Sequence, residues 1–335
     1  MRFEREVLEI ALEALRDRSE VNRPPIRRPV RRRWRSGIAI SAAGVAIAIA
    51  LPIVLPGGGT GGADPAAAGL LHRAALRAAA RPAEPLPGDG EYLYSKSTGS
   101  SRFVYVVGDG DTFVFHATGT RESWIGSDGS GRIIETPESI TFPTDRDRAA
   151  WIAAGSPSLE WVVEGDPEFE HLEPGSLVPN DFTGLPTDPE ELRELIERRE
   201  LIGGPPGDYE TFVIVGDLLR ETWTTPQVRA ALYQVAAELP GVELVGRVVD
   251  DAGRAGVAVA YAQPGGDARS RLELIFDPTT AELLGERQVM VEDSTVDVQS
   301  GGPGAVYGGV GPAGTETYSA TYLVSGVVED TTERL

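Results

Sequence analysis

The chain of 335 residues contains no cysteine, carries a formal net charge of −20 and is 41% hydrophobic. The absence of cysteine excludes disulfides, thiol nucleophiles and cysteine-ligated zinc, and the hydrophobic content suffices for a core that folds without them. The charge is divided, because residues 1–36 have a net charge of +5 and the rest of the chain has −25. An acidic main part argues against nucleic-acid binding there, since phosphate backbones require a basic face.

The first predicted element is an amphipathic helix over residues 3–18. One face of this helix is apolar and the opposite face is charged, which is the pattern of a helix that packs on a partner. The apolar stripe consists of Phe3, Val7, Ile10, Ala14 and Leu15. An isolated helix of this length is marginal in water, so we expect a protein groove, a second copy or the membrane surface to cover the stripe. Residues 19–35 are proline-containing and are predicted to be a tether.

The second predicted element is a transmembrane helix over residues 37–56. This segment is apolar, lies in an uncharged run and is long enough to span about 30 Å, the thickness of the hydrocarbon core of a bilayer. A basic cluster precedes it and consists of Arg27, Arg28, Arg31, Arg32, Arg33 and Arg35. Because arginines next to a span resist translocation, the sequence predicts a cytoplasmic amino terminus and an extracytoplasmic carboxy-terminal part.

Two alternatives for residues 37–56 are a cleaved signal peptide and a buried core helix. A signal peptide has a short charged region, whereas 36 residues precede this segment, and no A-x-A cleavage site follows it. A core helix of this length normally has a polar edge. The pattern therefore favours an uncleaved single-pass anchor in the cell membrane.

Residues 57–86 are predicted to contain a flexible glycine-rich spacer and a short helix. The spacer is PGGGTGG, and the helix begins with Asp64 as its N-cap and Pro65 at its first position. Three prolines, at positions 82, 85 and 87, follow the helix and end it.

Residues 87–335 are predicted to form an extracytoplasmic α+β domain in which antiparallel meanders pack on helices. The first meander is predicted as five short strands, at 91–97, 102–107, 112–118, 121–127 and 131–137. Helices are predicted from Thr144, from Asp188 as a cap, over 208–223 and over 225–239. A second meander is predicted at 242–249, 256–263, 271–277, 281–291 and 317–329. The two meanders could form one curved sheet around the helices, as in LolA-like lipoprotein folds.

No pattern in the sequence indicates catalysis, a cofactor or a metal. The three histidines, His72, His116 and His171, lie in different predicted elements and have no triad spacing. Acidic residues near 109–111 and 250–251 lack the ligand spacing of an EF-hand and fit hairpin turns. The tryptophans at 124, 151, 161 and 223 are predicted to fill the core, although an apolar ligand groove is an alternative.

Several segments together resemble a family of actinobacterial single-pass membrane proteins of unassigned function. The segments are RESWIGSDGSGR, TPQVRAALYQVAAELPGVELVG, DAGRAGVAVAY, LELIFDPTTAELLGERQV and YLVSGVVE. The genes of this family often lie beside those of extracytoplasmic-function sigma factors, so the resemblance implies a role in signalling. The tail has neither the His nor the Cys of zinc-binding anti-sigma factors, and contact with a sigma factor would depend on the helix at 3–18.

The sequence therefore predicts a non-enzymatic, membrane-anchored regulatory or sensory protein with a possible link to a sigma factor. Its outer domain would bind an external ligand and its inner helix would report the binding. The alternative is a cell-envelope carrier of an apolar ligand, cradled by the curved sheet.

Overall fold

The computed structural model describes most of the chain after the predicted span. The described ranges are 63–83, 87–108, 111–159, 172–174, 184–200, 207–220, 224–263, 270–295 and 303–335. Within these ranges the protein is α+β, with five helices and one nine-stranded, antiparallel sheet. The α+β class predicted for residues 87–335 is therefore confirmed. The predicted cytoplasmic helix and transmembrane helix lie outside the described ranges.

The helices begin where the capping residues predict. They are α2 (Pro65–Ala79), α3 (Asp145–Ala153), α4 (Pro189–Glu200), α5 (Asp208–Arg220) and α6 (Pro226–Glu238). Asp64 and Thr144 cap α2 and α3, and the carboxylate of Asp188 accepts hydrogen bonds from the amides of Glu190 and Glu191 in α4. Each cap satisfies backbone donors that the first helical turn leaves unpaired. None of these described helices has the length and hydropathy that crossing a bilayer requires.

The strands of the two meanders join in a single sheet. They are β1 (Tyr92–Gly108), β2 (Asp111–Gly126), β3 (Gly131–Thr141), β4 (Val242–Val249), β5 (Ala255–Ala262), β6 (Ser270–Phe276), β7 (Leu283–Met290), β8 (Val306–Gly308) and β9 (Glu316–Val328). Their order is β3-β2-β1-β9-β7-β6-β5-β4, and β8 pairs with β1. The last long strand, β9, therefore lies between the two meanders and unites them.

The first meander has three long strands, and the prediction of five short strands was wrong. The breaks were predicted where Gly, Ser and Thr interrupt the apolar pattern. In the structure these residues face one another across the ladder, with Thr98 opposite Thr120 and Gly99 opposite Gly119. Pairing on both sides of β1 outweighs their weak strand propensity. The short strand β8 was also missed, because the glycine-rich sequence around it, at 301–314, has no strand pattern.

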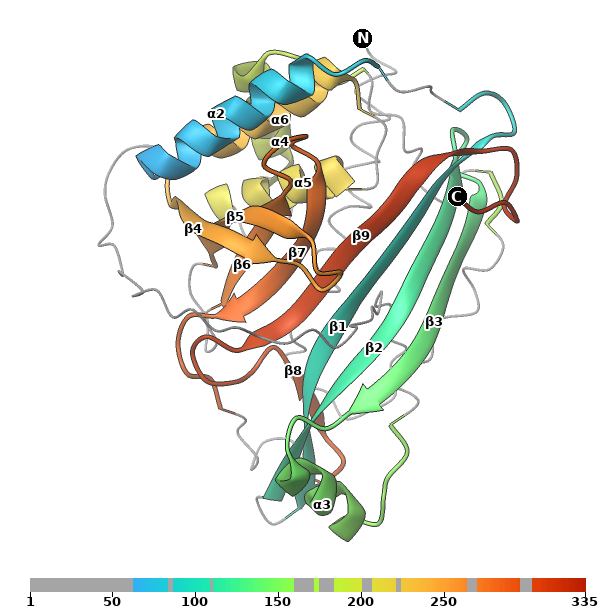
Figure 1. Cartoon of the computed structure of the whole chain (residues 1–335), viewed down its shortest axis with the longest axis vertical. Coiled ribbons are helices and arrows are strands. Elements are labelled where there is room, and N and C mark those ends of the chain that lie inside the picture. The colour runs from blue at the N-terminus through green and yellow to red at the C-terminus, as the bar shows by residue number, and fades with distance from the viewer. Residues whose placement is uncertain are drawn as a thin grey trace.

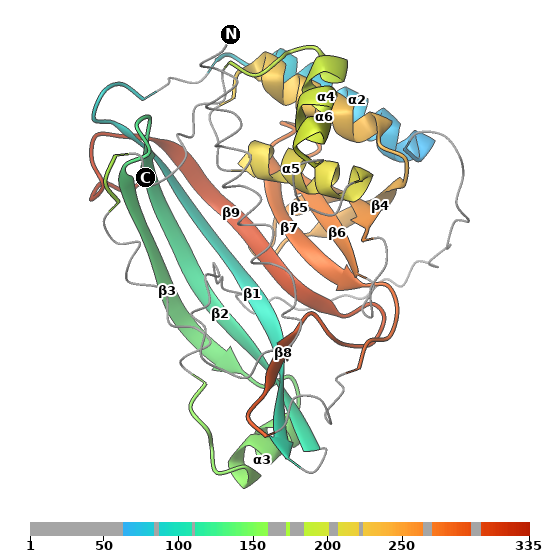
Figure 2. The ribbon, with the colours of Figure 1, turned by 180° about the vertical axis from the view of Figure 1, so that it is seen from behind.

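The helices form a layer at one end of the sheet. In Figure 1 and, from behind, in Figure 2, α2, α4, α5 and α6 gather over β4–β7, while β1, β2, β3 and β9 extend away to α3 at the other end. Helix α6 is the centre of this layer, and its Val228, Leu232 and Val235 are fully buried. Burial of each such side chain contributes about 1.5–3 kcal/mol, so this packing is a major source of stability.

The sheet is strongly curved: the turn between β4 and β5 contacts β9, although β6 and β7 lie between β5 and β9 in the sheet. The guanidinium of Arg254 in this turn donates to the carbonyl of Leu284 in β7 at 2.9 Å and to that of Tyr322 in β9 at 2.8 Å. The hydroxyl of Ser319 in β9 donates to Asp251 at 2.8 Å. The side chain of Asp250 pairs with Arg254 within the turn, so both acidic residues belong to a hairpin as predicted.

A row of alternating charges crosses the sheet on the face turned away from the helices. The fully buried carboxylate of Glu273 in β6 accepts hydrogen bonds from Arg271 and Arg287, with donor–acceptor distances of 2.7 Å to each Nε. Arg287 also approaches Glu316 of β9, at 3.9 Å. Burial raises the pKa of Glu316, and the charge of Asp251 raises it further.

We expect the variant Glu316→Gln to be more stable than the unaltered chain at pH 7. A carboxyl group with a raised pKa in the folded state binds protons more tightly there than in the unfolded chain. Its contribution to stability therefore falls as the pH rises from about 4.3, the pKa of an unperturbed glutamate, through the higher pKa of the folded state. Urea unfolding at pH 4 and pH 7 measures this, and the advantage of the variant should shrink at pH 4. A variant that is less stable at pH 7 contradicts the assignment.

Candidate functional site: the junction of α2 with the sheet

The site residues predicted from sequence all lie outside the described ranges. They are the basic cluster Arg27, Arg28, Arg31, Arg32, Arg33 and Arg35, and the apolar stripe Phe3, Val7, Ile10, Ala14 and Leu15. The roles predicted for the basic cluster in membrane topology and for the apolar stripe in partner binding therefore stay predictions. The described element nearest to them in sequence is α2, which follows the predicted span and its spacer. We therefore describe how α2 is attached to the rest of the fold.

The chain is fixed to the sheet at the point where it enters α2. The backbone amide of Asp64 donates to the carbonyl of Val242, the first residue of β4, at 2.9 Å. The carboxylate of Asp64 also accepts a hydrogen bond from the amide of Ala66, at 3.4 Å. The start of α2 is thus fixed by its own cap and by the sheet.

Helix α2 packs on α6 through small side chains. Its buried residues are Ala67, Leu71, Ala74, Ala75 and Ala78. Alanines at this spacing line one face of the helix and permit close approach of the two backbones, while Leu71 supplies the largest apolar contact. The opposite face is exposed and carries His72 and Leu76, of which Leu76 is 72% exposed.

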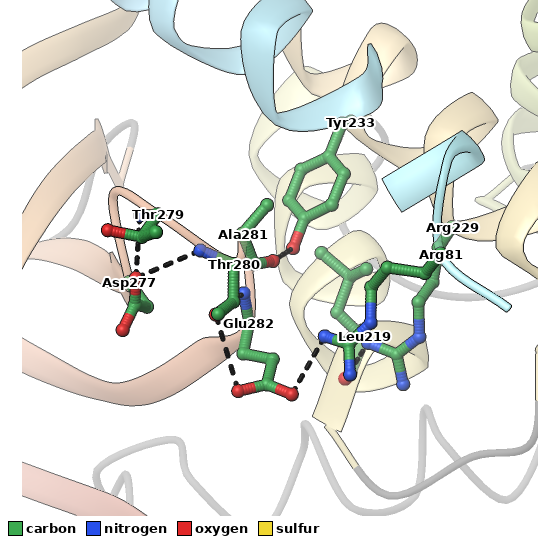
Figure 3. Close-up of polar contacts among 9 residues, drawn as sticks. All are labelled: Arg81, Leu219, Arg229, Tyr233, Asp277, Thr279, Thr280, Ala281 and Glu282. Carbon is green, nitrogen blue, oxygen red and sulfur yellow. Dashed lines mark hydrogen bonds and ion pairs between the residues drawn. The ribbon is translucent and has the colours of Figure 1, made fainter. Parts of the chain in front are cut away.

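The turn between β6 and β7 reaches the helix layer and is held in a defined shape (Figure 3). The carboxylate of Asp277 accepts hydrogen bonds from the amides of Thr279 at 2.6 Å and Thr280 at 3.0 Å. These bonds hold the pKa of Asp277 below its usual value, the one from Thr280 contributing most. Ala281 has a φ of 63°, in the left-handed region that is unfavourable for a residue with a Cβ. The surrounding contacts therefore maintain a strained turn.

Figure 3 shows two of the contacts that join this turn to the helices, which also include a hydrogen bond from the guanidinium of Arg77 in α2 to the carbonyl of Pro278. The hydroxyl of Tyr233 in α6 donates to the carbonyl of Ala281, and burial raises the pKa of Tyr233 well above its usual range. The guanidinium of Arg81, just after α2, pairs with Glu282 at 2.7 Å. The ion pair is half-exposed and contributes at most about 1 kcal/mol. The buried hydroxyl contact is the stronger of the two, because its loss leaves a buried carbonyl unpaired.

The same region connects the helices with one another. The guanidinium of Arg229 in α6 donates to the carbonyl of Leu219 near the end of α5, at 3.2 Å. A cation at this end of a helix also interacts favourably with the helix dipole. Helices α2, α5 and α6 and the β6–β7 turn therefore form one connected unit, which we call the α2 junction.

We expect Tyr233→Phe to lower the free energy of unfolding by about 1–2 kcal/mol, because the aromatic packing remains while the carbonyl of Ala281 loses its donor. Arg81→Ala should lower it by less than about 1 kcal/mol. Urea unfolding of the two variants under identical conditions measures the difference. Equal effects, or a larger effect of Arg81→Ala, would show that the hydroxyl contact is not the main attachment of the turn.

Other candidate residues named from sequence do not assemble into a site. His72 is exposed on α2, and His116 is half-buried in β2, where burial and the nearby Arg102 lower its pKa. His171 lies outside the described ranges, as do Trp161 and Trp223. Trp124 is fully buried, as predicted, and Trp151 is half-buried. Within the described ranges, no group of three or more His, Asp or Glu residues is arranged to hold a metal ion.

Sequence reasoning missed the residues of the α2 junction. The turn at 278–280 was predicted between the strands at 271–277 and 281–291, and Tyr233 is the single tyrosine of α6. Nothing in the sequence indicated that these two elements meet, because Tyr233 and Ala281 are 48 residues apart and are brought together only by the tertiary fold.

No model of a known protein family matches the chain, and no curated protein is significantly similar to it.

Proposed function

We propose that the chain is a non-enzymatic, membrane-anchored regulatory or sensory protein, with residues 1–36 in the cytoplasm and residues 57–335 outside. Residues 37–56 are the single transmembrane helix. The outer domain binds an external ligand or partner, and the helix at residues 3–18 contacts a cytoplasmic regulator, with a sigma factor as the first candidate.

The α2 junction is the observation that carries this proposal. A domain that reports to its anchor requires a stiff connection between its binding surface and the first residue after the linker. Here the amide of Asp64 is bonded to β4, α2 is buried on α6, and Arg81 pairs with the β6–β7 turn. A shift of the sheet relative to the helix layer therefore moves α2, and with it the chain that leads to the membrane. Seven residues, GGGTGGA at 57–63, separate the predicted span from Asp64, and their length sets how far the domain can move relative to the membrane.

The distribution of charge supports the same topology. The tail at +5 matches the anionic inner surface of a membrane, and the remaining chain at −25 is repelled by it. The apolar stripe predicted on residues 3–18 requires a partner, because an isolated helix of this length is marginal in water, and a cytoplasmic regulator would provide one.

The test is a transcript comparison in cells that carry the full chain or a variant. Ile10→Glu places a charge in the stripe, and Ser19→Glu places the same charge in the tether as a matched control. We expect Ile10→Glu to change a set of transcripts that depends on one sigma factor, and Ser19→Glu to leave that set unchanged. The combination of Arg81→Ala with Tyr233→Phe should change the same set although the tail is unaltered. Unchanged transcripts with Ile10→Glu at normal protein level would reject the proposal.

A carrier of an apolar ligand in the cell envelope is the second candidate, and the curvature of the sheet favours it. The contacts of Arg254 with β7 and β9 bend the sheet across one end, as a LolA-like cradle requires. Mass spectrometry of the full chain purified from membranes would detect lipid in a stoichiometric amount if this function is correct. Lipid at trace level only would reject it.

A further inference from the structure

Residues 329–335 fold back onto the sheet after the end of β9. The end of the chain lies beside the upper parts of β1 and β2 in both Figure 1 and Figure 2. The segment has a local turn, in which the carboxylate of Asp330 accepts hydrogen bonds from the amides of Thr332 at 2.7 Å and Glu333 at 3.1 Å. The segment therefore presents Glu333 and Arg334 to the sheet in a defined geometry.

The surface under this segment is built from two large aromatic side chains. Tyr94 of β1 and Trp124 of β2 are almost fully buried, and their ring centroids are 5.0 Å apart. The indole N–H of Trp124 donates to the carbonyl of Glu333 at 2.6 Å. The guanidinium of Arg334 lies over the same ring, 5.0 Å from its centroid, which is the geometry of a cation–π contact.

A carboxylate completes the surface. Glu122 of β2 accepts hydrogen bonds from Nε of Arg334 at 2.8 Å and from the hydroxyl of Tyr94 at 2.7 Å. Burial alone would raise the pKa of Glu122, but the hydrogen bonds from Arg334 and Tyr94 outweigh it and lower the pKa. The carboxylate is therefore ionised at neutral pH and matches the charge of a guanidinium.

The two sides of this contact differ in exposure. The side chain of Glu122 is 12% exposed and lies on β2, a long strand paired on both sides, whereas that of Arg334 is 46% exposed. Leu335, the residue after Arg334, is 57% exposed. The surface formed by Tyr94, Glu122 and Trp124 is therefore held in place by strand pairing. Residues 329–335 lie on it as an internal ligand, bound mainly through Glu333 and Arg334. A ligand of this kind can be exchanged for another with the same chemistry.

We propose that Tyr94, Glu122 and Trp124 form a binding site for an arginine-bearing peptide segment, which residues 329–335 fill as an internal ligand until the segment of a partner protein displaces them. The indole N–H of Trp124 donates to the backbone carbonyl of the residue before the arginine, and the indole ring and the carboxylate of Glu122 bind the guanidinium. Lysine binds less well, because its ammonium group lacks the planar, two-donor geometry of a guanidinium. The partner is a different protein, because the strongly negative charge of this chain disfavours a second copy. This site is independent of the proposed function.

The test uses the full chain and a labelled synthetic peptide with the sequence EDTTERL, that of residues 329–335. Arg334→Ala in the chain removes the internal guanidinium from the site and weakens the hold of residues 329–335, and Arg148→Ala removes an exposed arginine of α3 as the matched control. We expect the peptide to bind the Arg334→Ala chain at least about tenfold more tightly than the unaltered or the Arg148→Ala chain. A peptide with Lys in place of Arg should bind at least about fivefold more weakly, and Glu122→Gln in the Arg334→Ala chain should weaken binding similarly. Equal binding to all chains, or to none, overturns the proposal.

A second measurement does not depend on emptying the site by mutation. Because the chain has no cysteine, Leu335→Cys provides a single position for a spin label. Saturating amounts of the arginine peptide should increase the mobility of the label, and the same peptide with Ala in place of Arg should not. A label whose mobility does not respond to the arginine peptide overturns the displacement.

Discussion

The variant Gly131→Ala is expected to lower the free energy of unfolding by about 3 kcal/mol or more. Gly131 begins β3 with a φ of 152°, which a residue with a Cβ rarely adopts. A Cβ at this position would lie 1.9 Å from the carbonyl oxygen of Trp124. Hydrogen bonds with Leu172, in both directions, hold the backbone of Gly131 on its other side. Neither Trp124 nor Leu172 can move away without breaking backbone hydrogen bonds. The backbone strain of the positive φ therefore adds to the steric clash with the carbonyl of Trp124.

The matched control is Gly253→Ala, in the turn between β4 and β5. Gly253 has a φ of 79°, but nothing lies within 4 Å of the position that a Cβ would occupy. This variant carries only the cost of the left-handed conformation, about 1–2 kcal/mol. Urea unfolding of both variants should therefore give a clearly larger loss for Gly131→Ala. Equal losses would show that the close approach of Gly131 to Trp124 is not a constraint on the fold.

The variant Glu273→Ala is expected to lower the free energy of unfolding by about 3–5 kcal/mol. The side chain of Glu273 is fully buried and accepts hydrogen bonds from both Arg271 and Arg287. Removal of the carboxylate leaves two arginines that are only 27% and 23% exposed, and their charges then repel each other. Breaking a buried pair in this way is costly, because the longer contact of Arg287 with Glu316, at 3.9 Å, compensates the two remaining charges only in part.

Glu282→Ala is the control for the loss of an ion pair at the surface. Its partner is Arg81, and the two side chains are 50% and 34% exposed. Solvent screens such a pair, so the loss should be at most about 1 kcal/mol. Chemical unfolding at pH 7 in low salt compares the two. A loss for Glu273→Ala as small as that for Glu282→Ala would mean that water reaches the cluster and that Glu273 has no structural role.

The predictable part of the fold was the part determined by local sequence. Helices with a capping residue and a following proline, such as α2 after Asp64 and α6 after Thr225, began where they were predicted to begin. The turns at 251–253 and 278–280 were likewise predicted, because Asp, Gly and Pro favour tight turns. The length of β1 and β2 was not predictable from local pattern, since Gly99 and Gly119 are weak strand residues that become acceptable only by pairing.

The sites depend on contacts that no local pattern contains. Tyr233 and Ala281 meet because α6 lies across the end of the β6–β7 hairpin. Trp124 was predicted to fill the core, and it does, but its contact with Arg334 joins residues about 210 positions apart. The side chains that matter in both places are ordinary in their own elements. Their roles arise from the curvature of the sheet and the return of the chain after β9.

The orientation of the chain in the membrane is the claim on which the proposed function depends most. Because the chain has no cysteine, a thiol-specific reagent labels only an introduced cysteine, and the labelling shows on which side of the membrane that position lies. Ser19→Cys places a thiol in the tail, and Ser127→Cys places one in the exposed turn between β2 and β3. In intact cells a membrane-impermeant maleimide should label Ser127→Cys, and it should label Ser19→Cys only after the membrane has been opened. Labelling of Ser19→Cys in intact cells, or protection of Ser127→Cys there, would contradict a cytoplasmic tail and an extracytoplasmic domain.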